Sequence, residues 1–588
     1  MKLLIVESPT KSKKLRQFLP GDFRIAASFG HVRDLPRSGG LSVQFADGHV
    51  TPTYETIERA HKAVRELQQL AKQADEILLA TDPDREGEAI AWHVAVLLEG
   101  NASKCKRVTF NAITRKAVLA AIAAPRELDM GLVGAQQARR ILDRVVGWVV
   151  SPTLSRGLHD KAARSAGRVQ SVALRIVAER EREIAKHNTV DYFVLEATLS
   201  KRGTPPPFVA RLIEWKGEAL GHRLTDKTAA EGTAAWCQRQ PWTVLGVDSR
   251  EQQRNPPPPF VTATVQQAAS VRLKFDPKRT MDLLQQLFEN GHITYHRTDS
   301  VAVTPEAIDE ARRVIADKFP TEFLPDKPVI HDTKAANTQE AHEAIRPTHP
   351  EKDQVDSGDA GKLYRLIWER FIASQMAPGR DHLTTIRVAV AKDGFQHPKH
   401  GSVPMGVFET KGKVLLFEGW RALTDDTTAE LGKKTGTGKK KAKDDDSPQL
   451  PLVRAGDPLD CDKLNAVKRS TKAPPRYTQA SLIKKLETEG VGRPSTYATI
   501  MSTIISRNYV AEKQRKLHAT ELGLKVTDFL VQRFVGNFID LDFTARMEDR
   551  LDQVAAGQDN WEEVVTAASF HVRDLAQQAG LGHDPLSG

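Results

Sequence analysis

The segment ILLATDPDREGEAIAWH (residues 77–93) runs from a short apolar stretch through an acidic turn into a helical pattern. Its first four residues are continuously apolar, as in a buried strand, and the helical pattern extends from Glu88 to Leu98. The segment KLLIVESPTK (residues 2–11) has the same order, because its apolar run ends at Glu7-Ser8-Pro9. Apolar residues recur every three or four positions over 57–74, which indicates an amphipathic helix, and 107–110 resembles another strand. The first 125 residues therefore alternate strand and helix and predict a parallel sheet with crossover helices.

Three carboxylates follow the predicted strands of this sheet. Glu7 follows the first strand, and Asp82 and Asp84 follow the run at 77–80. The carboxyl ends of parallel strands meet at one edge, where open α/β sheets bind ligands. Mg²⁺ accepts a few carboxylates and keeps water for a phosphate oxygen, so the acids predict a magnesium site. The alternative is that Asp82-Pro83-Asp84 caps the next helix, but four charged neighbours favour the metal site: Lys11, Arg85, Glu86 and Glu88.

The rest of the chain alternates between helical and strand-like blocks. Helical patterns cover 130–190, 261–290, 305–318 and the chain from 481 onward. Strand-like pieces cover 191–250, 383–391 and 404–417, and four prolines at 256–259 form a stiff boundary. Residues 433–446 (KKTGTGKKKAKDDD) are of low complexity and predict a disordered loop. Because the blocks are nested in one another, we expect domains built from discontinuous segments.

Composition narrows the class of protein. The 588 residues carry a formal net charge of +10 and a pI of about 9.3. This excess points weakly to a polyanionic partner such as nucleic acid, and composition alone agrees about equally well with a generically basic soluble enzyme. The three cysteines form no CxxC pair, which excludes a disulfide framework and a cysteine zinc ribbon. No run approaches the ~18 apolar residues of a membrane span, and the start is too short for a signal peptide. We therefore expect a soluble, cytoplasmic protein without a membrane partner.

A second candidate site is GHITYHRTDS (residues 291–300). A tyrosine can attack phosphorus and become a phosphotyrosine, although a phenol with a pKa near ~10 needs nearby cations to do so. Arg297 lies two residues beyond Tyr295, on the same side of an extended chain, where its guanidinium could clamp a phosphate. Simple packing of the tyrosine is the alternative.

Two basic segments form a third candidate. In QQARRILDR (136–144), Arg139 and Asp143 are four residues apart and could pair on one helix face. In SAGRVQS (165–171), Gly167 permits close backbone approach before Arg168. These arginines either form surface salt bridges or grip phosphates.

The segment AHEAIRPT (341–348) is a fourth candidate. An arginine at position 346 rules out the HExxH pattern of a zinc protease, so His342 is a candidate for proton transfer or phosphate contact. Residues 436–439 (GTGK) lack the leading glycine and the following Ser/Thr of a phosphate loop, so no ATP site is predicted.

Taken together, these motifs resemble those of type IA DNA topoisomerases, in the order of that family. KLLIVESPTK and TDPDREGEAIAWH (81–93) resemble its Toprim domain, and ITYHRTDS its nucleophile region. AHEAIRPT and PPRYTQASLIKKLETEGVGRPSTYATI (474–500) resemble the topoisomerase I branch, and FTARMEDRLDQVAAG (543–557) the usual close of the core. Members of this branch often carry C-terminal zinc ribbons, which this sequence lacks, so we expect either a tail-less protein or a truncated one.

The resemblance implies a multidomain fold that combines α/β, α and β parts: a Rossmann-like Toprim domain within a four-domain toroidal core. Its expected boundaries are 1–125 for Toprim, 126–190 with 475–588 for a helical DNA-gripping domain, 191–258 with 380–474 for a strand-rich arch, and 259–379 for a helical domain bearing the nucleophile.

The resemblance also assigns residues. Tyr295 corresponds to the nucleophile, Arg297 to its transition-state partner and Lys11 to a lysine near the leaving group. Glu7, Asp82 and Asp84 correspond to ligands of Mg²⁺, and Glu7, Glu86, Glu289 and His342 to supporting catalytic positions. The residues expected to bind DNA are His31, Arg139, Arg140, Asp143, Trp148, Ser165, Ala166, Gly167, Arg168, Val169, Gln170, Arg297 and Arg493.

The implied function is relaxation of negatively supercoiled DNA without ATP. Tyr295 cleaves one strand, a 5′-phosphotyrosine forms, the other strand passes and the break is rejoined. The expected partner is the single-stranded region of a supercoiled duplex, and the protein is expected to be a nucleoid-associated monomer. The alternatives are a topoisomerase III-like decatenase, another Toprim phosphoryl-transfer enzyme such as a primase or nuclease, and a non-catalytic DNA-binding protein.

Overall fold

The structure is a computed structural model that describes residues 1–588 except 39, 161, 164, 221–223, 332–341, 424–449, 535, 537, 579–585, 587 and 588. The low-complexity run 433–446 therefore lies outside the described residues. No helix among the residues described is long and apolar enough to cross a bilayer.

The N-terminal part is built on a four-stranded parallel sheet. Its order is β2 (Phe23–Ala27), β1 (Lys2–Val6), β7 (Glu76–Leu79) and β8 (Cys105–Arg107). Apolar residues fill β1 and β7, so both faces are buried beneath helices. The connecting helices are α1 (Pro9–Leu15), α2 (His61–Gln73), α3 (Arg85–Leu97) and α4 (Arg115–Ala123). The predicted parallel α/β sheet is confirmed, although α3 begins at Arg85 and the last strand ends at Arg107, whereas the sequence pattern predicts a strand over 107–110.

An insertion between β2 and α2 forms two small ribbons that the sequence pattern does not predict. They pair β3 (Arg33–Asp34) with β6 (Glu55–Thr56) and β4 (Val43–Ala46) with β5 (His49–Pro52). Both ribbons are short, and their sequences lack the long alternation of apolar and polar residues that usually indicates a strand.

A second group of helices shares one apolar core. It contains α5 (Met130–Leu158), which includes Pro152, and α6 (Arg168–Lys186). Far along the chain, α12 (Gln479–Thr488), α13 (Tyr497–Ser506), α14 (Glu521–Phe534), α15 (Leu541–Ala555) and α16 (Trp561–Gln578) pack onto them, with a ribbon of β18 (Val510–Lys513) and β19 (Lys516–Ala519).

The strand-rich part is a seven-stranded antiparallel sheet. Its order is β11 (Glu218–Ala219), β10 (Thr204–Trp215), β16 (Gly406–Phe417), β13 (Gly379–Val390), β12 (Trp242–Arg254), β17 (Pro458–Ser470) and β9 (Asp191–Lys201). Because β9 also pairs with β10, six of these strands close on themselves around a core of their own. Helix α7 (Lys227–Gln238) packs against it, and a small ribbon pairs β14 (Phe395–His397) with β15 (Gly401–Val403).

A third helical group bears Tyr295. It consists of α8 (Thr262–Ala268), which continues as a π-helical turn over Ala269–Leu273, with α9 (Pro277–Glu289), α10 (Pro305–Lys318) and α11 (Gly358–Ser374). Its apolar core is continuous with one face of the four-stranded sheet, which joins these two parts of the chain.

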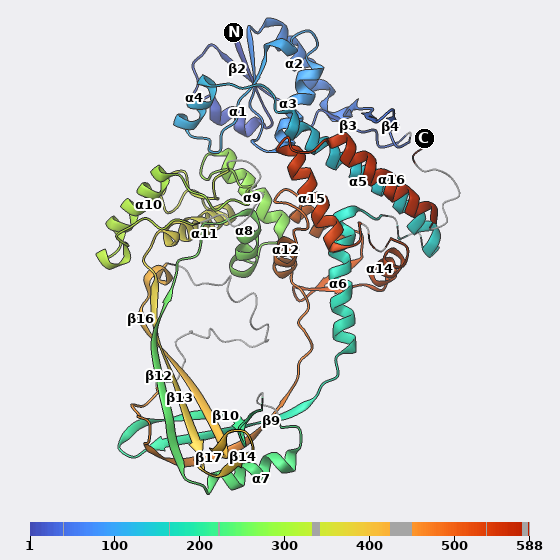
Figure 1. The fold of residues 1–588 in the computed structure, drawn as a ribbon. Coiled ribbons are helices and arrows are strands. Elements are labelled where there is room, and N and C mark those ends of the chain that lie inside the picture. The colour runs from blue at the N-terminus through green and yellow to red at the C-terminus, as the bar shows by residue number, and fades with distance from the viewer. Residues whose placement is uncertain are drawn as a thin grey trace.

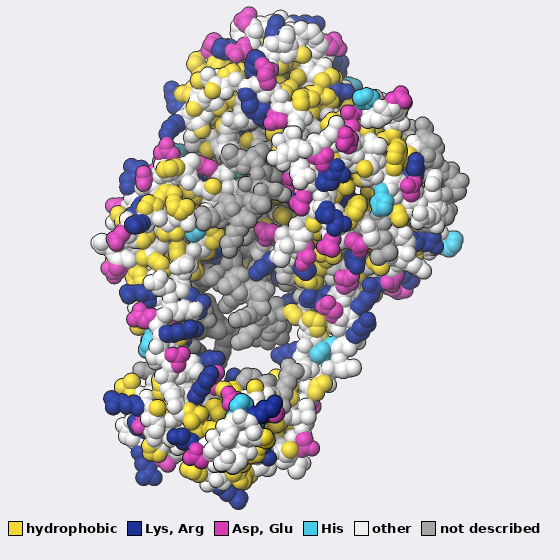
Figure 2. Space-filling view, in the orientation of Figure 1, with side chains coloured by type: hydrophobic (Ala, Val, Ile, Leu, Met, Phe, Trp, Pro, Cys, Tyr) yellow, Lys and Arg dark blue, Asp and Glu magenta, His cyan; other side chains and the backbone are white. Residues whose placement is uncertain are grey.

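The four groups are arranged around an open centre (Figure 1). The parallel sheet lies at one end and the closed sheet at the other; long strands β12, β13 and β16 lead from the closed sheet to the third helical group along one side, and α6 of the second helical group lies along the other side. An opening between the closed sheet and the helical groups remains visible with side chains drawn (Figure 2). The predicted toroidal, multidomain fold class agrees with this arrangement.

Candidate active site

The acidic side chains lie at the carboxyl edge of the parallel sheet. Glu7 directly follows β1, and Asp82 and Asp84 lie between β7 and α3. Asp84 is the N-cap of α3 and accepts a hydrogen bond from the Gly87 amide at 2.8 Å. The helix-capping role considered as the alternative to a metal site is therefore present, and it leaves the second carboxylate oxygen of Asp84 for other contacts. A Cβ at Gly87 would lie 2.0 Å from the Asp82 carbonyl oxygen, which explains why the turn requires glycine there.

Glu7, Lys11 and Asp82 form a tightly coupled, buried group. The Asp82 amide donates to Glu7 Oε1 at 3.0 Å, and Lys11 Nζ donates to Asp82 Oδ1 at 2.9 Å. Burial and the charge of Asp82 raise the pKa of Glu7 well above its usual value. Burial acts to raise the pKa of Asp82 as well, but the charge of Lys11 and a hydrogen bond with Glu7 hold it well below its usual range. Asp82 is therefore the charged member of the pair.

Arg107 is a structural residue of this site that the sequence patterns do not reveal. It is fully buried, and its guanidinium donates to Glu88 and to the carbonyl oxygens of Leu79, Thr81 and Asp82. These bonds hold the chain between β7 and α3 in place. A lone arginine at a strand end carries no sequence signal for this role.

Tyr295 reaches the acidic edge from the third helical group. Its ring is 1% exposed, its amide donates to the Asn111 carbonyl at 2.7 Å, and its hydroxyl donates to Asp84 Oδ2 at 2.7 Å. The rings of Phe288 and His342 pack edge-on at 5.2 and 5.7 Å. Burial and the charge of Asp84 raise the pKa of Tyr295 well above its usual value, so the phenol is protonated here.

Arg297 links the tyrosine to a second acid. Its Nη1 lies 3.2 Å from Asp84 Oδ2 and 2.5 Å from Glu86 Oε2, while His31 Nε2 contacts Glu86 Oε1 at 3.1 Å. Burial opposes ionisation of Glu86, but hydrogen bonds from His31 and Arg297 lower its pKa to about 2. The tyrosine, the arginine and two carboxylates thus form one hydrogen-bonded group.

Two further predicted residues, His342 and Glu289, differ in whether they contact the active-site turn. His342 Nε2 lies 2.8 Å from the Pro83 carbonyl oxygen, in the turn between Asp82 and Asp84, so this nitrogen must carry the proton. Glu289 accepts a hydrogen bond from Gln285 one turn earlier on α9, and the described contacts do not join it to Tyr295.

The carboxylates suit a hard cation chemically, because all three offer oxygen donors. In this structure, however, Lys11 neutralises Asp82, while Arg297 and the Tyr295 hydroxyl occupy Asp84. In the described residues no three potential ligands converge as a metal site. The donor set therefore fits Mg²⁺ only if the ion displaces one of these partners.

Three of the predicted DNA-binding arginines are paired with acids of α15. Arg139 and Arg168 both contact Glu548, the latter at 2.6 Å, and Arg493 Nη2 lies 2.7 Å from Asp552. The expected pair of Arg139 with Asp143 does not form, because Arg139 turns to Glu548 and Asp143 lies 3.4 Å from Arg168. Burial opposes ionisation of Glu548, but four arginines hold its pKa well below its usual range.

The remaining predicted contacts lie on α5 and at the start of α6. Trp148 is 41% exposed, and the Arg144 guanidinium stacks over its ring at 5.8 Å. Gln170 donates to the Ser165 hydroxyl at 3.4 Å, and a Cβ at Gly167 would lie 2.4 Å from Gln170 Nε2. Ala166 and Val169 belong to or pack against the core of this group and show no polar side-chain function.

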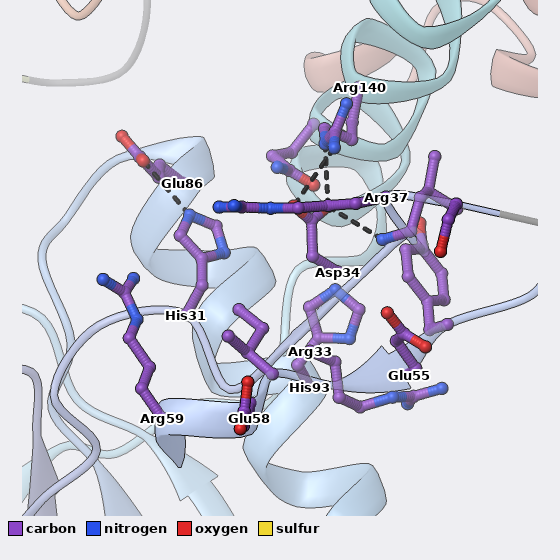
Figure 3. A pocket seen from close by; sticks show the side chains of 15 residues that line it. His31, Arg33, Asp34, Arg37, Glu55, Glu58, Arg59, Glu86, His93 and Arg140 are labelled. Atoms are coloured by element: carbon purple, nitrogen blue, oxygen red, sulfur yellow. Dashed lines mark hydrogen bonds and ion pairs between the residues drawn. The ribbon is translucent and has the colours of Figure 1, made fainter.

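A pocket of about 610 Å³ adjoins the active-site acids at Glu86 (Figure 3). Glu86 and His31 stand on one side of it, and Arg140 on the other, paired with Asp34 at 2.8 Å. Arg33, Arg37 and Arg59 also line the pocket. The pocket therefore connects Glu86 at the acidic edge with Arg140 of α5.

Comparisons with known proteins point to one family. A family model described as DNA topoisomerase matches residues 127–566, and one described as Toprim domain matches residues 2–113. DNA topoisomerase 1 of Zymomonas mobilis is 41% identical over 96% of this chain and 45% of its own length, and that of Salmonella typhimurium is 39% identical over 96% and 65%. The crystal structure of full-length topoisomerase I from Thermotoga maritima is 32% identical, with a TM-score of 0.78 over 97% of this chain and 89% of that chain. The chain thus spans about half to two thirds of the length of these two curated relatives.

Proposed function

Because this chain belongs to the DNA topoisomerase family, we propose that it relaxes negatively supercoiled DNA by transient cleavage, passage and rejoining of single strands. The family resemblance expected from the motifs is confirmed by the matches over 2–113 and 127–566. The relatives named DNA topoisomerase 1 favour the type IA, topoisomerase I branch over a topoisomerase III-like enzyme.

The contact between Tyr295 and Asp84 is the single observation that carries the mechanism. These residues are 211 positions apart, yet the phenol donates to the carboxylate at 2.7 Å with Arg297 beside both. A buried tyrosine that served packing alone would not need a charged acceptor and a guanidinium at its oxygen. A nucleophile needs both, since the phenol must lose its proton and the phosphate needs a cation.

The proposed reaction exchanges one phosphate ester for another. The Tyr295 oxygen attacks phosphorus and forms a new P–O bond, and its proton passes to Asp84. The bond to the 3′ oxygen breaks, and that oxygen leaves as a hydroxyl after taking up a proton from solvent water. The 5′-phosphate stays on Tyr295, Arg297 balances the charge on the phosphoryl oxygens, and Lys11 contacts the phosphate near the leaving group. Rejoining is the reverse, so no ATP is consumed.

We assign a supporting role to a divalent cation, with Mg²⁺ as the ion. Glu7, Asp82 and Asp84 would hold it, once Lys11 or Arg297 is displaced. Bound there, the ion would polarise phosphate oxygens and orient the hydroxyl for rejoining. His342 would orient the turn at Pro83, and Glu86 would orient Arg297. Glu289 is proposed as a supporting residue that approaches Tyr295 only after rearrangement.

The same proposal covers the substrate and the organisation of the chain. A single DNA strand would lie along Arg139, Arg140, Asp143, Trp148, the 165–170 segment and Arg493, and reach the acidic edge past His31. We propose that the protein acts as a cytoplasmic, nucleoid-associated monomer. Its proposed domains are 1–125, 126–190 with 475–588, 191–258 with 380–474, and 259–379.

A plasmid assay tests this function directly. Negatively supercoiled plasmid is incubated with the protein, with Mg²⁺ or with excess chelator, and topoisomers are separated on a gel. We expect relaxation with Mg²⁺ and none with chelator, and loss of relaxation when Asp82 and Asp84 are both replaced by alanine. Normal relaxation by the double variant, or in chelator, would refute the metal site; no relaxation by the intact protein under any condition would refute the function.

A further inference from the structure

Asp552 on α15 contacts two arginines that belong to different parts of the proposed site. Its Oδ1 accepts from Arg85 Nη2 at 2.6 Å, across 467 positions of sequence. Its Oδ2 accepts from Arg493 Nη2 at 2.7 Å and Nε at 3.0 Å. Figure 1 shows why one side chain can do this, because α15 (Leu541–Ala555) runs up along α5 and α6 and its C-terminal end, which bears Asp552, lies beside α3.

Both arginines lie next to groups that the proposed reaction uses. Arg85 is the first residue of α3 and directly follows Asp84, the N-cap whose other oxygen accepts from Tyr295. Arg493 lies in the turn before α13, where its side chain also donates to the Gly490 and Gly492 carbonyls. One carboxylate therefore connects the acidic turn with the proposed DNA groove.

The surroundings of Asp552 are short of hydrogen-bond acceptors. Four arginines, Arg85, Arg139, Arg168 and Arg493, face two buried carboxylates, Glu548 and Asp552. Arg85 Nη1, Arg139 Nε and Arg168 Nη2 are buried without a hydrogen-bond partner among the residues described. Asp552 is the carboxylate that Arg85 contacts in the described structure, so without it a buried guanidinium would have to move.

We propose that Asp552 is a positioning residue that ties the strand-gripping Arg493 to the active-site turn through Arg85. This inference rests on the proposed function. Because Arg85 and Asp84 are consecutive, a guanidinium held by Asp552 fixes the first turn of α3 and with it the carboxylate that accepts the Tyr295 proton. The same carboxylate opposes binding of a phosphate beside Arg493, since like charges repel.

These two effects have opposite signs when the charge is removed. In Asp552→Asn the groove gains one net positive charge, so binding of a single strand should tighten by about twofold to fivefold. Cleavage by the bound protein should slow by roughly tenfold, the usual scale for loss of a residue that orients a reacting group. A residue that only maintained the fold would weaken binding and cleavage together.

The experiment measures the two steps separately. Binding of a fluorescent single-stranded oligonucleotide is followed by anisotropy in chelator, and the covalent adduct is then counted over time on a denaturing gel at saturating protein. Asp549→Asn is the matched control, because Asp549 lies 3.2 Å from Arg493, is half-exposed and does not contact Arg85. It should tighten binding in the same way without slowing the adduct.

A double variant tests the path through Arg85. Arg85→Gln should slow adduct formation about as much as Asp552→Asn, and the two together should slow it no further, because both break one link. Equal slowing by Asp549→Asn, additive effects in the double variant, or tighter binding with unchanged cleavage in Asp552→Asn would each overturn the proposal.

If the intact protein forms no adduct, the proposed function itself fails, which is a different outcome from a normal adduct in the variants. Thermal unfolding of each variant identifies any that have lost the fold. If Asp552→Asn has lost it, Asp552→Glu is compared with the intact protein, because it keeps the carboxylate. Normal cleavage by Asp552→Glu supports the link, and slow cleavage by a folded Asp552→Glu contradicts it.

Discussion

At Tyr295, the proposed nucleophile differs from a packed core side chain by one oxygen atom. The ring is buried against Phe288 and His342, whereas the hydroxyl contacts Asp84. Tyr295→Phe keeps the ring and removes the oxygen, so we expect a folded protein that binds single strands but forms no covalent adduct and relaxes no plasmid. Adduct formation on a denaturing gel and thermal unfolding check the two halves of this prediction.

Tyr364 offers a matched control for that experiment. It is equally buried in the same helical group, but its hydroxyl donates to the backbone carbonyl of Lys352 at 2.6 Å and not to a carboxylate. Tyr364→Phe should lose some stability, by about 1 kcal/mol for one hydrogen bond, and retain the adduct. Residual adduct in Tyr295→Phe would assign the nucleophile to another residue.

Glu548 shows how a buried charge makes stability depend on pH. Its side chain is fully buried, and Arg139 and Arg168 are foremost in lowering its pKa below the ordinary 4.5. A carboxyl whose pKa is lower in the folded state stabilises the fold above the unfolded value, and this contribution is lost as the pH falls through the folded value. Glu548→Gln should therefore cost about 3 kcal/mol at neutral pH, and the difference from the intact protein should shrink below about pH 4.5. Thermal unfolding between about pH 7 and pH 3 measures this, and a pH-independent difference would contradict it.

At the scale of elements, the turn after α9 decides how closely the tyrosine segment approaches the parallel sheet. Gly291 has a φ of +74°, and a Cβ there would lie 2.5 Å from the Ile113 carbonyl oxygen. Gly291→Ala would strain the backbone by about 1–3 kcal/mol and push the turn away from the sheet. We expect less adduct at saturating DNA, because Tyr295 would no longer reach Asp84.

A glycine in open surroundings gives the comparison for that variant. Gly232 lies inside α7 with an ordinary helical φ, and a Cβ added there would meet nothing within 4 Å. Gly232→Ala should stabilise α7 by up to about 1 kcal/mol and leave the adduct unchanged. Unchanged adduct in Gly291→Ala as well would show that the close contact is not needed to bring the tyrosine to the acids.

The elements also show which parts of the fold and the site can be predicted from the sequence. Strand ends followed by acids identified Glu7, Asp82 and Asp84 as neighbours, because the geometry of a parallel sheet brings such ends together. The pairing of Arg139 was wrong, since its partner Glu548 lies 409 positions away and a local helix rule cannot find it. Arg107, Glu548 and Asp552 were missed for the same reason: buried ion pairs depend on tertiary packing. The closure of the large sheet through β9 and β10 was likewise out of reach, because alternating strand patterns do not specify their partners.

At the scale of the whole molecule, the ring is closed where the tyrosine-bearing helices meet the parallel sheet. Tyr295 and His342 each bond to the backbone of the sheet domain, at Asn111 and Pro83, and one apolar core spans both parts. A strand that enters the open centre would have to pass where the tyrosine-bearing helices meet the rest of the ring, because these helices touch the parallel sheet and also α12 and α13, whereas the other connections around the ring are continuous chain (Figure 1). In the proposed reaction, cleavage would need this contact closed, whereas strand passage would need it open.

A reversible cross-link across this contact should separate the two steps. Lys14 Cε lies 3.3 Å from the position of a Cβ at Gly291, and His292 follows directly, so Lys14→Cys with His292→Cys would place two thiols across the contact. Native Cys105 and Cys237 are buried and react poorly, and the two single variants control for Cys461. Joined by a short, reducible bismaleimide, the double variant should still form the adduct on an oligonucleotide, because Tyr295 and Asp84 stay together, but should not relax a plasmid. Reduction should restore relaxation, since it lets the ring open again. Relaxation at the normal rate by the fully cross-linked protein would mean that the strand passes elsewhere, and loss of the adduct would mean that cleavage itself needs this contact to move.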